Sequence, residues 1–221
     1  MSWRRFLHVA AVSAALALGL GAADAARAAA DSFVVDTATP ESLVRTLSTG
    51  VLDDIRGDRA IRSGDIARLQ RLIDARILPY VDMERTTRLV VGRAWRQATP
   101  AQRTAIMMQF RLLLVHTYAG ALSRVTDEKV HVLPVREQPY PDDAIIRTQI
   151  ISATSANPID LAYRLGKTDR GWQIYDLNIM GIWLVQTYKS EFNEIINQHG
   201  IDGLIRMLTE KNQQLAAKKS S

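Results

Sequence analysis

The chain has 221 residues, of which 47% are hydrophobic and 23% are charged, and it contains no cysteine. Those proportions are typical of a globular protein and exclude a disordered or low-complexity chain. The absence of cysteine excludes disulfide scaffolds, thiolate zinc sites, iron–sulfur clusters and a cysteine nucleophile.

The first 30 residues have the pattern of a secretory signal peptide. Arg4 and Arg5 precede an apolar run over 9–23, which is shorter than the roughly 20 residues that span a bilayer. The alanine-rich stretch 22–30 then offers small-residue cleavage sites. We therefore expect export and cleavage, with an N-terminal membrane anchor as the alternative. Removing residues 1–30 lowers the net charge from +5 to +3, which argues against nucleic acid as a partner.

The rest of the chain reads as one unit. It contains neither an internal repeat nor a linker long enough to separate a second domain. We expect a single domain over 31–215 and a frayed basic tail over 216–221.

Apolar residues at helical spacing predict helices over 40–57, 65–77, 81–91 and 100–125. The last of these begins at Thr99, where a proline follows and Gln102 completes a capping signature. Its polar side chains occupy only about a quarter of the helical circumference, whereas a surface helix has an apolar stripe of roughly 100°. This helix is either a central core helix or one whose apolar surface partly faces a cavity.

The period of the hydrophobic pattern changes after Asp127. Alternating and β-branched segments predict strands over 129–135, 144–152, 159–165 and 172–180. Two helices follow, over 183–199 and 201–215, with Gly200 between them. The expected fold class is α+β, with a curved four-stranded antiparallel sheet and helices packed on one of its faces.

Motifs for catalysis are missing from the sequence. His116, His131 and His199 fall in different elements, and there is no HExxH, P-loop, dinucleotide fingerprint or Gly-x-Ser-x-Gly motif. Asp176 lies inside an apolar strand, where a carboxylate needs a partner, and we interpret it as a structural anchor. The sequence therefore favours binding over catalysis, with no metal and no cofactor.

Five arginines cluster just before the long apolar helix and in its first turn. The ordinary interpretation is a solvated face; the alternatives are contact with anionic lipid or with an acidic partner. They are Arg85, Arg88, Arg93, Arg96 and Arg103.

Several short motifs, in order over most of residues 40–210, resemble those of a known family. It is the family of periplasmic phospholipid-binding carriers of the Mla (maintenance of lipid asymmetry) pathway, also called the toluene-tolerance family. One departure is Trp183, where the family commonly has a small hydroxyl residue, and it would reshape one end of a pocket. The motifs are Ile77-Leu78-Pro79-Tyr80-Val81-Asp82, Gly92-Arg93-Ala94-Trp95, Ala98-Thr99-Pro100-Ala101-Gln102, Thr117-Tyr118-Ala119, Trp172-Gln173-Ile174-Tyr175-Asp176, the isolated Gly181, and Gly200-Ile201-Asp202-Gly203-Leu204.

The resemblance implies a soluble carrier in the periplasm of a Gram-negative cell, which helps maintain outer-membrane lipid asymmetry. The family fold is a cystatin-like cone whose sheet and helices enclose an apolar pocket for lipid tails. The family's partners are an outer-membrane lipoprotein–porin complex and an inner-membrane ABC transporter with a ring of MCE-domain subunits. The resemblance implies no catalytic residues; phospholipid is the cargo, and we expect a monomer.

On this basis twelve side chains are expected to line the lipid pocket, five from the long helix and seven from the sheet. A carrier of another lipid, such as a hopanoid, and a periplasmic enzyme or scaffold remain alternatives. The expected lining is Phe110, Leu113, Leu114, Thr117, Tyr118, Ile146, Thr148, Ile150, Leu161, Tyr163, Tyr175 and Leu177.

Overall fold

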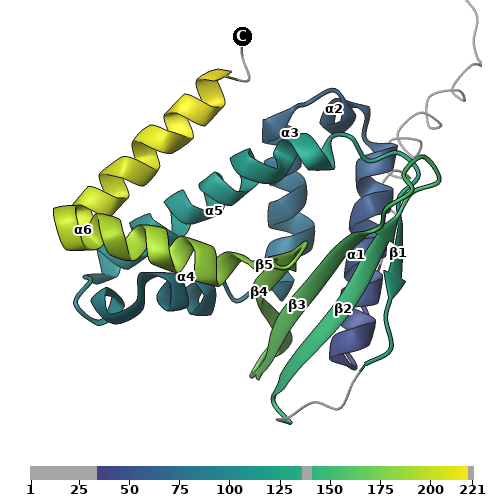
Figure 1. Ribbon diagram of the computed structural model, residues 1–221, viewed down its shortest axis with the longest axis horizontal. Coiled ribbons are helices and arrows are strands. Elements are labelled where there is room, and N and C mark those ends of the chain that lie inside the picture. Colours follow the sequence, from purple (N-terminus) through teal and green to yellow (C-terminus); the bar gives the residue numbers. More distant parts are fainter. Residues whose placement is uncertain (1–33, 136–140, 219–221) are drawn as a thin grey trace, which may run out of the picture. The chain divides into compact units, whose positions relative to one another are not determined.

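The computed structural model describes residues 34–135 and 141–218, which form an α+β arrangement of helices and one antiparallel sheet (Figure 1). The chain divides into two units, Met1–Phe33 and Val34–Ser221, and the described helices and strands all belong to the second. The expected signal peptide, residues 1–30, lies outside the described residues.

The first half of the domain is helical, as the sequence predicts. The segment predicted as one helix over 65–77 is an α-helix that continues as a π-helical turn. It ends at Ile77, two residues before Pro79, which has no N–H to donate. The elements are α1 (Pro40–Gly57), α2 (Arg59–Arg62), α3 (Ile66–Leu72), η1 (Ile73–Ile77), η2 (Leu78–Tyr80), α4 (Met83–Val91), η3 (Gly92–Arg96) and α5 (Pro100–Leu122).

The predicted cap of α5 is present. Thr99 Oγ1 accepts a hydrogen bond from the N–H of Gln102 at 3.2 Å, and Gln102 Oε1 accepts one from the N–H of Thr99 at 2.9 Å. By length and composition alone α5 is also apolar enough to cross a membrane. Its packing against α3, α4 and α6, and a hydrogen bond from Asn212 Nδ2 to the carbonyl of Gln109 at 2.9 Å, instead make it a core helix of this domain.

The last helix, α6 (Leu184–Lys218), contains one break, at Gly200. Gly200 has a φ of 68°, in the left-handed region that favours glycine, and α6 changes direction there (Figure 1). This confirms the predicted boundary between two helical segments. The second segment reaches Lys218, three residues beyond its predicted end.

The sheet is an antiparallel meander with the order β1-β2-β3-β4-β5. The four predicted strands are confirmed, but a short fifth strand follows them. The strands are β1 (Lys129–Val132), β2 (Asp143–Ile151), β3 (Ile159–Thr168), β4 (Gly171–Ile179) and β5 (Ile182–Trp183).

The fifth strand corrects one boundary. Trp183 was expected to begin a helix, but it pairs with Asn178 on β4, and α6 starts one residue later. Met180 and Gly181 have φ values of 50° and 91°. Positive φ at both central residues is the geometry of a two-residue hairpin turn, so the chain folds back along β4 before the helix begins.

Helices contact both faces of the sheet, so the expectation of helices on one face is wrong. On one face, Tyr163 OH lies 3.4 Å from Ser48 Oγ of α1. Side chains alternate between faces along a strand, so the neighbouring Arg164 points to the other face, where it pairs with Asp176. There the N–H of Val185, in the first turn of α6, bonds to Asp176.

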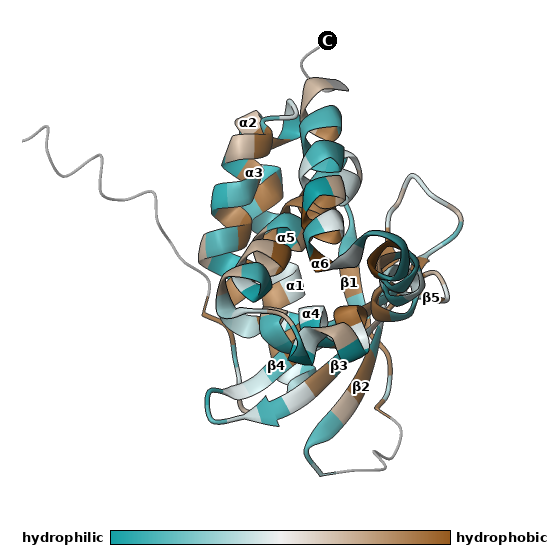
Figure 2. Cartoon of the chain, turned by 90° about the vertical axis from the view of Figure 1, so that its left-hand side faces the viewer, coloured by the Kyte–Doolittle hydropathy of each residue, from teal (hydrophilic) through white to brown (hydrophobic). Residues whose placement is uncertain are grey.

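The helices share a separate apolar cluster, here called the helical cluster. Figure 2 shows hydrophobic positions, in brown, recurring along α5 and α6 as well as along β2 and β3. The buried members of the helical cluster come from α4, η3, α5 and α6. They are Val90, Val91, Trp95, Ile106, Phe110, Leu113, Tyr188, Phe192, Leu204 and Leu208.

Candidate functional site

Six of the seven predicted sheet residues share one face of the sheet. Directly paired residues of antiparallel strands lie on the same side, and so do residues two apart along a strand. Ile146 pairs with Tyr163, Tyr163 pairs with Leu177, and Thr148 pairs with Leu161. With Ile150, two residues after Thr148, they form a continuous patch on the side of α1, called here the α1-side face.

The α1-side face is incompletely covered. Ile146 and Thr148 are only 1% exposed, whereas Leu161, Tyr163 and Leu177 are half-buried. Burial raises the pKa of the Tyr163 phenol, which therefore stays neutral, and its hydroxyl contacts Ser48 Oγ. The accessible part of this face is thus apolar, with one neutral hydroxyl.

Tyr175 is placed differently from the other six sheet residues. The guanidinium of Arg85 lies over its ring, 3.6 Å from the centroid, and donates to Asp143 at 3.0 Å. A Cβ on Gly166 would lie 1.9 Å from Nη1 of Arg85, so Arg85 occupies the space that a side chain at 166 would fill. Residue 166 faces away from Tyr163, so Tyr175 lies with Arg85 on the opposite face.

The expected helix residues pack into the helical cluster. Phe110 is fully buried, with its ring centroid 5.0 Å from that of Tyr188 and 5.2 Å from that of Phe192, both in edge-to-face geometry. Leu113 is also buried there, and Leu114 packs against the cluster from its margin. The expected lining is therefore divided between this cluster and the α1-side face.

Thr117 and Tyr118 lie at the edge of the helical cluster. Thr117 is exposed and its hydroxyl donates to the carbonyl of Leu113 at 2.7 Å, while Tyr118 is half-buried beside Tyr188. Burial, together with the nearby Tyr118, raises the pKa of Tyr188 to about 12. Contact of any of the twelve residues with a ligand stays a prediction.

Asp176 has the partners that a structural role requires. Its carboxylate accepts hydrogen bonds from the N–H groups of Leu177 and Val185 and from Nη1 of Arg164, at 2.9–3.0 Å. Burial nevertheless raises its pKa, because desolvation destabilises the charged carboxylate by more than the three hydrogen bonds stabilise it. Over residues 34–135 and 141–218, no three His, Cys, Asp or Glu side chains gather where they could hold a metal ion.

Trp183, the departure from the family pattern, belongs to the face opposite the α1-side face. The guanidinium of Arg164 lies over its ring, 3.8 Å from the centroid. Any pocket that Trp183 shapes therefore lies on the face opposite the α1-side face.

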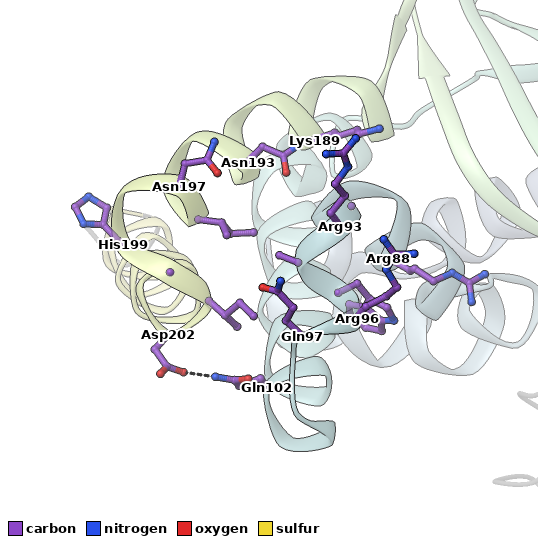
Figure 3. A pocket seen from close by; sticks show the side chains of 16 residues that line it. Arg88, Arg93, Arg96, Gln97, Gln102, Lys189, Asn193, Asn197, His199 and Asp202 are labelled. Atoms are coloured by element: carbon purple, nitrogen blue, oxygen red, sulfur yellow. Dashed lines mark hydrogen bonds between the residues drawn. The ribbon is translucent and has the colours of Figure 1, made fainter.

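One cavity in the described part of the chain includes none of the twelve predicted residues. It measures 1190 Å³ and lies between η3 and α6 (Figure 3). The arginine run in the sequence indicates its η3 wall. Its other wall includes Gly200, Ile201 and Asp202 of one family motif, whereas the α6 residues Lys189, Asn193 and Asn197 belong to no motif identified in the sequence. A second cavity, of 500 Å³, lies between α1 and β1.

Comparisons with known proteins give one consistent result. A family model described as MlaC protein matches residues 45–210. The intermembrane phospholipid transport system binding protein MlaC of Haemophilus influenzae is 25% identical over 178 residues, covering 80% of this chain and 83% of its relative. A solved structure of the phospholipid-binding protein from Ralstonia solanacearum, in complex with a phospholipid, is 39% identical with a TM-score of 0.76. That match covers 80% of this chain and 98% of the other.

Proposed function

The chain belongs to the MlaC family, and on this premise we propose that it is a periplasmic carrier that moves phospholipid between the outer and inner membranes. The observation that carries the proposal is the Ralstonia solanacearum structure, in which a protein 39% identical to this one, matched over 98% of its length, holds a phospholipid. The α1-side face supports it, since this face presents partly exposed apolar side chains beside α1.

A carrier of this kind answers a physical problem. Transferring an acyl chain from a bilayer to water costs about 0.8 kcal/mol per CH₂, so two chains cost on the order of 20 kcal/mol. A dry apolar cavity replaces the bilayer as the environment of the tails, while the headgroup stays in water. Binding of this kind requires no nucleotide and no catalytic group.

In the proposed complex the tails lie against the half-buried residues Leu161, Tyr163 and Leu177, and reach Leu114 and Tyr118 at the margin of the helical cluster. Phe110 and Leu113, which are buried within that cluster, hold the helical wall in place rather than contacting lipid.

The proposed cellular context follows the family. Residues 1–30 act as a cleaved signal peptide, and the mature monomer exchanges phospholipid with an outer-membrane lipoprotein–porin complex and with an inner-membrane ABC transporter carrying MCE-domain subunits. The net direction of transport then depends on the relative affinities of carrier and partners for the lipid. This cycle maintains outer-membrane lipid asymmetry.

The cargo is identified by gentle purification, solvent extraction and mass spectrometry of the mature protein. The proposal predicts a diacyl phospholipid in near-stoichiometric amount. A triterpenoid would replace it with the hopanoid alternative, and a lipid-free protein would favour the enzyme or scaffold alternative.

A further inference from the structure

The cavity between η3 and α6 is a groove with cationic walls and an apolar floor (Figure 3). Arg93 and Arg96 come from η3, Arg88 from α4, and Lys189 from the first segment of α6. The two walls approach each other at Gly92, where an added Cβ would lie 3.9 Å from Lys189 Cε. The floor is formed by residues of the helical cluster and its margin: Ala94, Trp95, Ile196 and Ile201.

The cationic residues of the groove lack acidic partners. Arg88, Arg93, Arg96 and Lys189 are exposed, and none of them forms an ion pair within residues 34–135 and 141–218. Asp202 is the one carboxylate among the lining residues, and it accepts a hydrogen bond from Gln102 Nε2 at 2.7 Å.

Concentrating like charges in a concave surface raises the local positive potential and attracts anions. It also costs stability through mutual repulsion.

The other two arginines of the predicted run, Arg85 and Arg103, form contacts within the domain. Arg85 pairs with Asp143, and Arg103 donates to the carbonyl of Trp95. Arg88, Arg93 and Arg96, the other three members of the run, are among the residues that line the groove.

The groove walls match a peptide better than a bilayer. Arginine presents a planar fork of donors that fits a carboxylate. The amides of Asn193, Asn197 and Gln97 supply both donors and acceptors, as a peptide main chain requires. The floor suits an aliphatic side chain. A bilayer surface is flat on this scale and contacts protruding groups, so it would not reach the floor of a concave groove.

We propose that this groove docks an acidic segment of a protein partner. The proposal rests on the proposed carrier function, because a carrier has to be held by its partners while lipid is exchanged. Its floor belongs to the helical cluster that also buries Phe110 and Leu113, so a docked segment would contact the same cluster that forms the helical wall of the lipid site.

The test measures fluorescence polarisation of a labelled 12-residue peptide composed of Glu, Asp, Leu and Gly, with a Gln/Asn version as the uncharged probe. The mature protein is compared with R93E/R96E and with R59E/R62E. Arg59 and Arg62 are exposed residues of α2 outside the groove, so the control carries the same change of net charge. Vesicles containing phosphatidylglycerol and phosphatidylethanolamine serve as the membrane probe.

We expect the acidic peptide to bind the mature protein, R93E/R96E to weaken it about tenfold or more, and R59E/R62E to change it less than about twofold. N197A should weaken peptide binding without affecting binding to vesicles. Absent peptide binding, equal loss in both double variants, or R93E/R96E losing only vesicle binding would overturn the proposal. Lipid extracted from each variant separates this from the carrier function: loss of docking leaves the lipid content unchanged, whereas a protein without lipid contradicts the carrier function itself.

Discussion

Oδ1 of Asp176, on β4, accepts a hydrogen bond from the main-chain N–H of Val185, in the first turn of α6, at 3.0 Å. The first N–H groups of a helix have no partner within the helix, so Asp176 caps α6 from the sheet. Its other oxygen binds Arg164, whose guanidinium lies over the ring of Trp183. One buried carboxylate thus joins a strand, a helix and the β4–β5 hairpin.

Replacing Asp176 with asparagine should destabilise the protein without abolishing lipid carriage. The amide offers one acceptor oxygen in place of two, and it turns N–H groups toward the Arg164 guanidinium or the main-chain donors. We expect the free energy of unfolding to fall by about 1.5–3 kcal/mol, the range for hydrogen bonds to charged groups. Thermal melting and lipid transfer, normalised to folded protein, measure the two effects.

The matched control is Asp160→Asn, on the neighbouring strand β3. Asp160 is exposed and its carboxylate accepts one hydrogen bond, from Gln149 Nε2 at 3.0 Å, so its replacement should change stability little. A D176N protein with wild-type melting but no lipid transfer would make Asp176 a functional residue instead of an anchor.

Replacing Tyr188 with phenylalanine should make the stability of the protein fall less steeply as the pH rises above about 10. The folded pKa of Tyr188 is about 12, above the value of about 10 in an unfolded chain. The unfolded state therefore loses this proton first, so stability falls as pH rises from about 10 to about 12 and is fully retained below about 10. A difference of about two pKa units corresponds to about 2.7 kcal/mol.

The measurement is the melting temperature of wild type and Y188F between pH 8 and 11, with tyrosine ionisation followed by absorbance. Y188F should be less stable at pH 8, by about 1 kcal/mol, because a buried hydroxyl contact is lost. Its melting temperature should then decline less steeply than that of wild type above pH 10. Parallel declines would contradict burial as the cause of the raised pKa.

Polar substitutions on the α1-side face should reduce bound phospholipid. Leu161→Gln and Leu177→Gln each place an amide against the proposed position of the tails. An unpaired buried amide costs about 1–3 kcal/mol, so retained lipid should fall about fivefold or more. Leu89→Gln is the control, since Leu89 is 38% exposed on α4. Circular dichroism checks folding, and full lipid content in both folded variants would remove this face from the site.

Export with cleavage of the signal peptide would set the mass of the mature protein. The arginine pair followed by an apolar run and alanine-rich sites places the mature N-terminus between residues 24 and 32. Intact-mass measurement of protein recovered from the periplasm checks this directly. Recovered protein that retains Met1 would contradict cleavage and favour an N-terminal membrane anchor.

The elements predicted correctly are those whose signals are local. The cap at Thr99 and the helix break at Gly200 each depend on a few adjacent residues, and the structure confirms both. Strand β5 depends instead on Met180 adopting a positive φ beside Gly181, which a non-glycine residue seldom does. The sequence pattern therefore extended α6 back over Trp183.

The grouping of the sheet residues shows the same limit. Alternation along β2 and β3 correctly predicts that Ile146 and Tyr163 share a face. The same alternation places Tyr175 with Leu177, but a bulge opposite Arg164 and Leu165 inserts an extra residue into β4 and changes the direction of Tyr175. Register shifts of this kind depend on tertiary packing, here on Arg85 against Gly166, and leave no periodic signal.

The most direct test of the carrier function is phospholipid transfer between vesicles. Donor vesicles hold a fluorescent phospholipid beside a non-exchangeable quencher, and the mature protein is added with excess unlabelled acceptor vesicles. The proposed function predicts a transfer rate that rises in proportion to protein concentration and falls severalfold with L161Q or L177Q, but not with L89Q. A rate equal to that of vesicles alone, at every protein concentration, would contradict it.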